Sequence, residues 1–459
     1  MNTDIFRAYD IRGIADEDLT DPVVRSIGQA FATMTIRAGY EAPRIGVGRD
    51  ARNSSDRVYE ALKDGLCKAG AHVVSLGTVP TPLVYFAAFT EGFHGAIQIT
   101  GSHNPGEYNG FKMMIGKDTL HGETIQDLRK LIEADDLIEG TEDLGCSALA
   151  DLRKSYIEWV RDNIRMGDRK LHIAMDSGNG VAGLLAPELV RDAVGVKVTE
   201  LYSEPDGTFP NHHPDPTVPE NLQDLIETVK KEGCDCGVAY DGDGDRIGVV
   251  DEEGRIIWGD RLLVLFARQV LANNPGATII GEVKCSQTLF DDIARHGGEP
   301  IMARVGHSLI KAKIKETDAL LAGEMSGHIF FNDRFFGFDD ALYATCRLVE
   351  ILSKTTQPLS ALLADLPTTY ATPELRRDCP ESLKFQVPGK VAEFFADDYE
   401  VNTIDGVRVK FDHGWGLVRA SNTQPVLVMR TEGNSPQSRD DYMTQLERAV
   451  AAAERALQG

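Results

Sequence analysis

The sequence predicts an α/β fold, with three similar mixed α/β domains and a smaller α+β domain at the C-terminal end. One observation is a repeated order of strand, polar loop, helix and second strand, which starts with the apolar strands near residues 44, 171 and 277. Another is a change near residue 370, after which strands follow one another through short turns before one long helix. Together these features predict three related units and a different fourth one.

The length of the chain agrees with this division. A domain usually contains about 100–200 residues, so a chain of 459 residues corresponds to three or four domains. The repeats end near residues 150, 252 and 367, where we expect the linkers. The predicted domains are 1–150, 151–252, 253–367 and 368–459.

Each of the three repeats continues to a further apolar strand that ends in an unusual loop. These stretches read GAIQITGSHNP from Gly95, CGVAYDGDGDR from Cys236 and DALLAGEMSGH from Asp318. Where strands alternate with helices, ligands gather at the carboxyl ends of the strands. We therefore expect the three loops to contribute to one site.

The fourth domain is predicted from three apolar stretches, TIDGVRVKF, WGLVRAS and PVLVMRTEG. In the helix that follows, Ser435 is the expected N-cap and Pro436 the first residue. Met443, Leu446 and Val450 recur at helical spacing along it. Strands joined by short turns and closed by one helix are typical of an α+β domain.

The composition argues against several classes of partner. The chain has 48 Lys and Arg against 71 Asp and Glu, so its net charge is −23. This charge disfavours binding to nucleic acid or to an anionic membrane. The seven cysteines are scattered and odd in number, which indicates neither a disulfide framework nor a zinc site. A reducing cytoplasm is the compartment that fits best.

No segment of the sequence has the character of a membrane span or a secretory signal. Asp4, Arg7 and Asp10 interrupt the amino-terminal stretch. The most apolar helical window, RLLVLFARQVLA, contains Arg268 and is shorter than the ~20 apolar residues that a span requires. We expect a soluble, cytoplasmic protein.

The strongest chemical signal is the loop YDGDGDR, which runs from Tyr240 to Arg246. The alternation of Asp with Gly allows a tight turn in which Asp241, Asp243 and Asp245 point toward one place. Three carboxylates are hard oxygen ligands that suit Mg²⁺, and phosphate oxygens commonly fill its remaining positions. The loop therefore predicts a magnesium site that handles a phosphate group.

Two other interpretations of this loop fit less well. A calcium-binding EF-hand loop has Gly at its sixth position, where this chain has Arg246, and helices rather than strands on either side. A plain acidic turn would bring three carboxylates together without a cation to offset their repulsion.

A second loop, RASNTQP from Arg419 to Pro425, has the composition of a phosphate site. It supplies guanidinium, hydroxyl and amide donors between two strands, and Arg430 follows on the second strand. Such donors suit a dianionic phosphate. Taken alone, the loop is equally typical of a polar turn with one surface arginine.

Two further loops carry reactive side chains. TGSHNP presents Ser102 at the end of a strand, as folds expose a nucleophile, although Asn-Pro is also ordinary turn chemistry. GEMSGH places Glu324, Ser326 and His328 within six residues. The carboxylate and hydroxyl suit vicinal sugar hydroxyls, and the imidazole could exchange a proton with one of them. A histidine after glycine is more often a packing residue, but its place in the repeat favours a role in the site.

Together, these loops resemble those of the α-D-phosphohexomutase superfamily, and among its members those of the bacterial phosphomannomutase/phosphoglucomutase group. The resemblance spans nearly the whole chain. The motifs that carry it, in the family's order, are FRAYDIRG at 6, TGSHNP at 100, FPNHHPDP at 209, DGDGDR at 241, GEMSGH at 323 and RASNT at 419.

The resemblance implies an active-site cleft at the centre of the four domains. The metal ligands that it implies are a phosphorylated Ser102 with Asp241, Asp243 and Asp245. The catalytic residues that it implies are Ser102, His103, Lys112, Arg246 and His328, with Lys112 or His328 in proton transfer. The substrate-binding residues that it implies are Tyr9, Arg12, Lys284, Arg304, His307, Glu324, Ser326, Arg419, Ser421, Asn422, Thr423 and Arg430.

The resemblance also implies an isomerase that moves a phosphoryl group between O1 and O6 of mannose and glucose phosphates. Hexose 1,6-bisphosphate would be its intermediate and activator, and Mg²⁺ its cofactor. GEMSGH lacks the Gln or second acidic residue that we associate with the glucosamine-phosphate and glucose-only branches, which favours dual specificity. The expected partners are hexose phosphates, without nucleic acid or membrane, and the expected state is a monomer.

Three alternatives stay open from the sequence. The chain could be a phosphoglucosamine mutase, a Mg²⁺-dependent sugar-phosphate phosphatase or a non-catalytic sugar-phosphate sensor. The RASNT loop would be a phosphate site apart from the metal loop. It disfavours the phosphatase, because a monophosphate hydrolase needs no second phosphate site. A sensor would need the arginines but not the serine and the metal loop.

Overall fold

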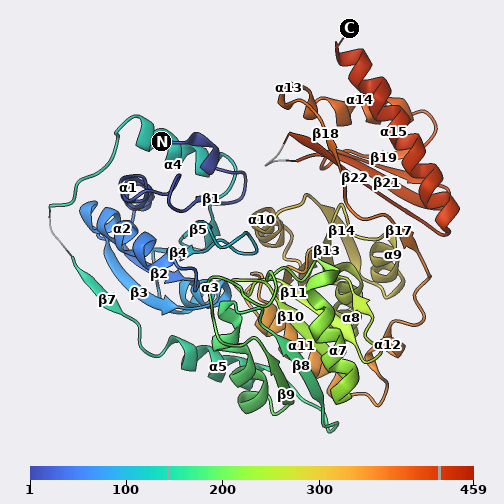
Figure 1. Ribbon diagram of the computed structural model, residues 1–459, viewed down its shortest axis with the longest axis horizontal. Helices are drawn as coiled ribbons and strands as arrows, with labels where there is room; N and C mark the ends of the chain where they lie inside the picture. The colour runs from blue at the N-terminus through green and yellow to red at the C-terminus, as the bar shows by residue number, and fades with distance from the viewer. Residues whose placement is uncertain (142–143, 422–424, 459) are drawn as a thin grey trace.

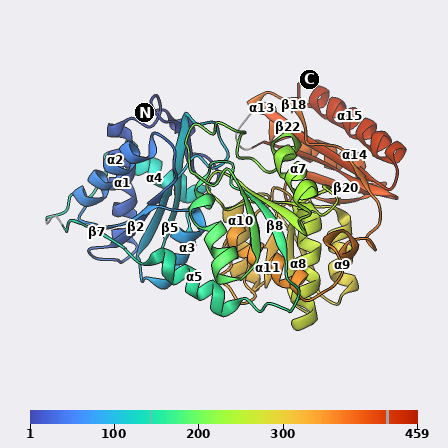
Figure 2. The same cartoon turned by 60° about the horizontal axis from the view of Figure 1, so that its bottom comes forward.

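The computed structural model describes residues 1–141, 144–421 and 425–458. Figure 1 shows four consecutive units arranged in an arc, from the blue first unit to the red fourth one, and Figure 2 shows the same order from another side. Three α/β units and one α+β unit confirm the predicted fold class. Within the described ranges, no helix is both long and apolar enough to cross a membrane.

The first unit combines a mixed sheet with helices that follow its strands. The sheet order is β1 (Ile11–Ile14), β5 (Tyr108–Ile115), β4 (Gly95–Ile99), β2 (Arg44–Arg49), β3 (His72–Thr78) and β7 (Cys146–Ala148), with β6 (Asp118–Thr119) paired to β5. The helices are α1 (Asp21–Arg37), α2 (Ser55–Lys68), α3 (Thr81–Thr90) and α4 (Glu123–Glu133).

The second unit repeats this plan with shorter helices. Its sheet order is β12 (Ile256–Ile257), β11 (Ile247–Asp251), β10 (Cys236–Tyr240), β8 (His172–Asp176) and β9 (Lys197–Leu201). Its helices include α5 (Leu152–Asn163), α6 (Ala186–Glu188) and α7 (Gln223–Glu232). Because β12 pairs with β11, strand pairing of this sheet extends to Ile257. The domain boundaries at 150, 252 and 367 stay predictions.

The third unit has the smallest of the three α/β sheets. The strand order is β14 (Glu299–Ala303), β13 (Thr278–Glu282), β15 (Leu321–Gly323) and β16 (Ile329–Phe331). The helices are α8 (Gly259–Asn273), α9 (Gln287–Arg295), α10 (His307–Thr317), α11 (Ala341–Ser353) and α12 (Leu359–Leu362).

All three α/β sheets place the unusual loop at the same corner. In each unit, the strand before the loop pairs in parallel with an inner strand: β4 with β2, β10 with β8 and β15 with β13. The strand after the loop pairs antiparallel with the strand before the loop: β5 with β4, β11 with β10 and β16 with β15. The sheets are therefore less parallel than the alternation of strands and helices predicts, because each loop closes a hairpin.

The sheet of the first unit contributes to two hydrophobic cores. Successive side chains of a strand point to opposite faces. Accordingly, Ile97 packs in a cluster with helices α1, α2 and α4, whereas its neighbour Ala96 packs in a cluster that contains α3. The second cluster is shared, since it also holds Tyr240 of the second unit and Phe331 of the third. One continuous core thus joins the first three units.

The fourth unit has an antiparallel sheet and a core of its own. The sheet order is β17 (Tyr370–Ala371), β22 (Val426–Gly433), β21 (Gly414–Ala420), β20 (Val407–Phe411) and β19 (Glu400–Asn402), with β18 (Leu375–Asp378) paired to β22. The helices are α13 (Glu381–Lys384), α14 (Val387–Phe395) and α15 (Pro436–Gln458).

The predicted start of the last helix is confirmed in detail. Pro436 is the first residue of α15, and the hydroxyl of Ser435 accepts a hydrogen bond from the backbone N–H of Ser438. Met443, Leu446 and Val450 are buried against the sheet, as their helical spacing predicts. Helix α15 lies along one side of the sheet in Figure 1.

A buried arginine attaches the fourth unit to the third. Arg408 donates hydrogen bonds to the carbonyl oxygens of Val283 (2.6 Å) and Cys285 (2.9 Å) and lies 3.9 Å from the ring centroid of Trp415. Trp415 itself packs with Val283 and donates from its indole to Glu432, 2.9 Å away. This contact fixes the fourth unit beside the loop that follows β13.

Arg408→Ala should loosen the attachment of the fourth unit. Two buried carbonyl groups would lose this donor, at a cost of about 1–3 kcal/mol for each unpartnered group. We expect faster amide hydrogen exchange at residues 283–287, measured by mass spectrometry on the full chain. Arg439→Ala, which removes an exposed arginine from the same unit, is the control. Unchanged exchange at 283–287 would mean that other contacts hold this interface.

Candidate active site

The loops of the first three units contact one another directly. Ser102, in the loop after β4, donates a hydrogen bond from Oγ to Oδ2 of Asp241 in the loop after β10, over 2.9 Å. Arg246 and His328 form an antiparallel backbone bridge between the second loop and the third. The loops that the sequence predicts as one site therefore meet at one place.

The aspartates of the second loop differ in how many of their oxygens have hydrogen-bond partners. Oδ1 of Asp241 accepts three backbone N–H groups of its own loop, each at 3.1 Å. Oδ2 of Asp243 accepts from Thr81 and from Lys112. The Oδ1 atoms of Asp243 and Asp245 are buried and have no hydrogen-bond partner among the described residues.

The loop of Ser102 approaches the aspartate loop as closely as a glycine allows. A Cβ atom at Gly242 would lie 2.4 Å from the carbonyl oxygen of Ser102, which is closer than carbon and oxygen can approach. Ser102 itself has a φ of +50°, a conformation that costs a side-chain-bearing residue about 1–2 kcal/mol. Such strain is typical of residues that the fold holds in place for function.

Two arginines hold the backbone around Ser102. Arg52, 3% exposed, donates to the carbonyl oxygens of Ser102 (2.8 Å) and Asn104 (2.6 Å) and pairs with Asp50 at 3.0 Å. Arg12 donates to the side chain of Asn104 over 2.6 Å. Charge-assisted bonds of this kind are about twice as strong as neutral ones, so the loop is firmly positioned.

Lys112 balances part of the buried negative charge. Its ammonium lies 2.7 Å from Asp243 and 2.5 Å from Asp245. Burial alone would lower the pKa of Lys112, but the carboxylates outweigh burial and raise it. Burial would likewise raise the pKa of Asp243, but the lysine keeps it low. Burial, together with Asp243 and Asp245, raises the pKa of Asp241 well above its usual range.

These carboxylates can hold a metal ion. Asp241, Asp243 and Asp245 each offer an oxygen, and the three atoms lie within 4.8 Å of one another. Two of those residues have an unpartnered buried oxygen, and one lysine does not balance three carboxylates. A divalent cation would bind these oxygens and complete the charge balance.

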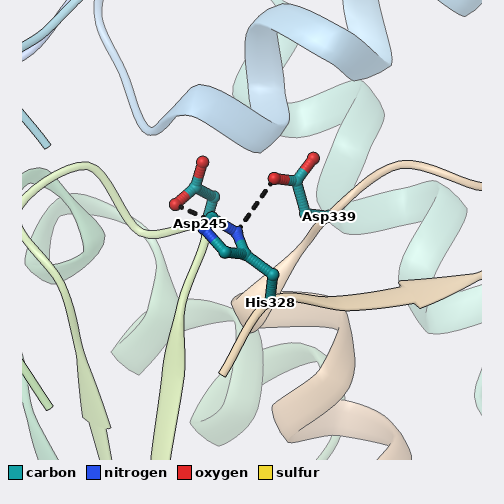
Figure 3. A group of neighbouring side chains, drawn as sticks. All are labelled: Asp245, His328 and Asp339. Carbon is teal, nitrogen blue, oxygen red and sulfur yellow. Dashed lines mark ion pairs between the residues drawn. The ribbon is translucent and has the colours of Figure 1, made fainter. Parts of the chain in front are cut away.

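His328 lies between an arginine and two carboxylates. Nε of Arg246 donates to Nε2 of His328 over 2.9 Å. Since a guanidinium only donates, Nε2 is the acceptor and Nδ1 carries the ring proton. Figure 3 shows Nδ1 facing two carboxylates, Asp339 at 3.0 Å and Asp245 at 3.6 Å. The ring is thereby held as the tautomer whose lone pair is at Nε2.

Two other histidines of the site are neutral. Burial lowers the pKa of both His103 and His307 well below the usual value for histidine. Nδ1 of His103 is 3.2 Å from Oγ of Ser102, and the ring of His307 stacks on His328 with centroids 5.5 Å apart. Neither ring adds positive charge around the aspartates.

Residues of the third and fourth units lie beside this cluster. Oε1 of Glu324 accepts the backbone N–H of Gly306 over 2.7 Å. A Cβ atom at Gly306 would lie 2.5 Å from the ring of Tyr9, so the first unit contacts the third here. Asp405 accepts from Nε of Arg419 and from the backbone N–H of Val305, each at 3.1 Å.

The remaining predicted residues are distributed around these contacts. Lys284 pairs with Glu374 at 2.7 Å, and Arg430 donates to the carbonyl oxygen of Lys284 over 2.8 Å. Ser421 is buried, Ser326 is half-buried and Arg304 is exposed. Asn422 and Thr423 lie outside the described residues.

Sequence reasoning missed three residues that support the site. Thr81 follows a Val-Pro turn and donates to Asp243; Arg52 follows β2; and Asp339 precedes the N-cap of α11. Thr81 and Arg52 lie far in sequence from the residues that they contact, whereas Asp339 lies in the same unit as His328. The stretch GRDARNSS contained Arg52, but nothing local in it marks the residue as a partner of Ser102.

Four family models match consecutive parts of the chain. They are described as phosphoglucomutase/phosphomannomutase alpha/beta/alpha domain I (residues 3–139), domain II (154–254), domain III (258–370) and C-terminal domain (374–449). The chain belongs to the phosphoglucomutase/phosphomannomutase family. The resemblance that the sequence motifs carry is thereby confirmed.

Relatives in this family match nearly the full length of the chain. A phosphomannomutase/phosphoglucomutase of Pseudomonas aeruginosa is 45% identical over 458 residues, which cover 99% of this chain and 96% of the relative. A phosphoglucomutase of Neisseria gonorrhoeae is 48% identical over 438 residues, 95% and 94% of the two chains. The crystal structure of a phosphoglucomutase/phosphomannomutase family protein from Burkholderia thailandensis has a TM-score of 0.92 at 45% identity and covers 99% and 98%.

Asp243→Asn should weaken metal binding, because one of three anionic oxygen ligands becomes neutral. With Mg²⁺ as the probe in a calorimetric titration, we expect a loss of at least about tenfold, since outer-shell changes alone cost 10–100-fold. Asp224→Asn, a change on the outer surface of the same unit, should bind Mg²⁺ like the unchanged chain. Equal affinity in all three proteins would exclude the aspartate loop as the metal site.

Proposed function

We propose that this chain reversibly converts the 1-phosphates of mannose and glucose into the 6-phosphates, through a phosphorylated Ser102 and a hexose 1,6-bisphosphate intermediate. The observation that carries the proposal is the 2.9 Å hydrogen bond between Oγ of Ser102 and Asp241, inside a cluster of metal-competent carboxylates. Membership of the family supports the same activity.

In the first half-reaction, phosphoserine donates its phosphoryl group to the free hydroxyl of a hexose phosphate. The bond between phosphorus and Oγ of Ser102 breaks, a bond from phosphorus to the sugar oxygen forms, and the hydroxyl proton passes to a base. After the bisphosphate has turned around, Ser102 takes back the other phosphoryl group. The net result is the movement of phosphate between O1 and O6, with nothing hydrolysed.

His328 is the better of the two candidates for the base. Its Nε2 carries a lone pair and contacts Arg246, whereas Lys112 is held in its charged form by the aspartates. Asp339 lies 3.0 Å from Nδ1 and would stabilise a protonated ring, and Nε2 would accept the proton once Arg246 turns from it to the phosphoryl group. Arg246, next to this nitrogen, would balance charge on the transferring group.

Mg²⁺ is the proposed cofactor, held by Asp241, Asp243, Asp245 and an oxygen of phosphorylated Ser102. When bound, it would neutralise negative charge on the transferring phosphoryl group. The oxygen-only donor set supports Mg²⁺ over softer metals. Hexose 1,6-bisphosphate would restore the phosphoserine whenever the intermediate escapes, and so acts as an activator.

The substrate contacts that we propose come from all four units. Glu324 would bind two sugar hydroxyls, since the bond from Gly306 occupies only one of its oxygens. Asp405 fixes the plane of Arg419, which prepares that side chain to bind the phosphate that is not reacting. The further proposed contacts are Tyr9, Arg12, Lys284, Arg304, His307, Ser326, Ser421, Asn422, Thr423 and Arg430, with His103 beside the serine.

The compartment and partners follow from the same features. All seven cysteines are free thiols, which supports a reducing cytoplasm. We propose a monomer whose partners are hexose phosphates. The alternatives are a phosphoglucosamine mutase and a Mg²⁺-dependent sugar-phosphate phosphatase.

Ser102→Ala should abolish isomerisation, by roughly 10³-fold or more, because the group that forms the covalent intermediate is removed. The purified unchanged chain should carry a phosphate that mass spectrometry maps to Ser102. Ser203→Ala, a serine outside the cluster, should retain activity. A chain that releases inorganic phosphate from hexose phosphates without isomerising them would be the phosphatase instead.

Mannose 1-phosphate and glucose 1-phosphate should both be good substrates. Glu324 would contact hydroxyls that the two sugars share. The sugars differ at C2, and a single hydroxyl there that the site does not contact discriminates weakly between them. The measurement is kcat/KM for mannose, glucose and glucosamine 1-phosphates with Mg²⁺ and a trace of bisphosphate. Relatives of similar identity carry both single and dual names, so this comparison decides the preference. A large advantage for glucosamine 1-phosphate would identify the chain as a phosphoglucosamine mutase.

A further inference from the structure

A cavity lies between the first and third units, behind the catalytic cluster. It has a volume of about 480 Å³ and opens between the β5–β6 hairpin and helix α10. Cavities of this size suit small organic ligands. Its lining includes the side chains of Phe89, Lys117, Thr119, His121, Ser308, Lys311, Phe336 and Phe338.

Three polar atoms of the lining are buried and unpartnered. They are Oγ1 of Thr119, Nδ1 of His121 and Oγ of Ser308, none of which has a hydrogen-bond partner among the described residues. Ser308 is only 1% exposed. Leaving a buried polar group without a partner is unfavourable, and three such groups on one cavity indicate a ligand that satisfies them.

The cavity also gathers positive charge. The side chain of Lys311 is 10% exposed, and Ser308 lies one helical turn before it on α10. The ammonium of Lys117 lies 5.0 Å from the ring centroid of Phe89 and has no ion-pair partner within the described residues. Lys315, at the rim, is already paired with Asp118 at 2.6 Å. Lys117 is therefore the lysine of the lining that can meet a negatively charged ligand directly, whereas Lys311 is paired with Asp339 at 3.0 Å and would have to be drawn from it.

The rest of the lining is aromatic. Phe336 and Phe338 stack with an interplanar angle of 4°, and Phe89 lies 5.4 Å and 5.6 Å from their centroids. Flat apolar groups pack well against such rings. A ligand that combines one anionic head group with a flat apolar body would match both halves of the lining.

We propose that this cavity binds a small organic anion with a flat apolar body, whose head group contacts Lys117, Lys311, Thr119 and Ser308. Its lining contains neither Ser102 nor an aspartate of the second loop, and Lys311 is the lining residue that also contacts His307 and Asp339. A carboxylate and a phosphate ester share the chemistry that the site recognises.

Lys311 connects the cavity to the catalytic cluster through Asp339. Oδ1 of Asp339 binds Lys311 at 3.0 Å, and Oδ2 binds Nδ1 of His328 at 3.0 Å, as Figure 3 shows for the second contact. An anion that attracts Lys311 competes with Asp339 for it and loosens the carboxylate that positions His328. On the proposed function, occupancy therefore lowers kcat and leaves KM unchanged.

The test uses 4-fluorobenzoate as the carboxylate probe and fluorine NMR of the full chain as the readout. We expect the probe to bind, and to bind at least about tenfold more weakly to the double variant Lys117→Ala, Thr119→Val, which loses one charge-assisted contact. Lys130→Ala, which removes an exposed lysine of α4 in the same unit, is the matched control and should bind normally. 4-Fluorophenyl phosphate tests the phosphate-ester head group, and inorganic phosphate tests the head group without the flat body.

Several results would overturn the proposal. These are no binding of either organic probe, equal binding by the double variant, or displacement of the probe by saturating glucose 1-phosphate, which would put it in the catalytic site. Inhibition by 4-fluorobenzoate that raises KM, or no inhibition at all, would refute the link through Asp339. A chain without mutase activity would fail the proposed function, but the binding measurement would still decide whether the cavity is a site.

Discussion

The balance of buried negative charge where three units meet is the constraint on which the rest of the structure depends. The carboxylates come from the second and third units, and the lysines that pair with them, Lys112 and Lys311, come from the first and third. Removing one partner of a buried ion pair costs about 3–5 kcal/mol, because the other charge remains buried. Separating the first unit from the second would break both pairs of Lys112, so these charges also hold the two units together, whereas the pair of Lys311 with Asp339 lies within the third unit. The carboxylates are those of Asp241, Asp243, Asp245 and Asp339.

The hairpin at the corner of each sheet is what brings these charges together. A loop that joins antiparallel neighbours is short, so its side chains stay close to the strand end that supports them. Gly242 permits the backbone of Ser102 to approach the aspartate loop, and the positive φ of Ser102 is maintained by the arginines beneath it. The three corners, one in each sheet, then differ in the length of the loop and in the side chains that it carries.

Local sequence patterns predicted the parts of the site that are local in structure. The alternation of Asp with Gly and the flanking apolar strands predicted the loop of Asp241, since every determinant lies within a dozen residues. The N-cap of α15 was predictable for the same reason. Asp339 was not predicted although it is near His328 in sequence, because the path of the chain after β16, and no residue pattern, places the two side by side. The antiparallel return of each loop strand also depends on pairing that no single segment encodes.

The first three units and the fourth unit are held in place in different ways. A continuous apolar core joins the first three units, and Ser102 and the aspartates that it contacts belong to these units. The fourth unit has a separate core and is joined to the third by Arg408 and Trp415 and by the polar contact of Asp405 with Val305. Polar contacts depend on direction and distance, whereas core packing depends on filling volume. The position of Arg419 relative to Ser102 therefore depends on these hydrogen bonds together with the packing of Trp415 and Leu417 against Val283, whereas the position of Ser102 relative to the aspartates depends on the core that the first three units share.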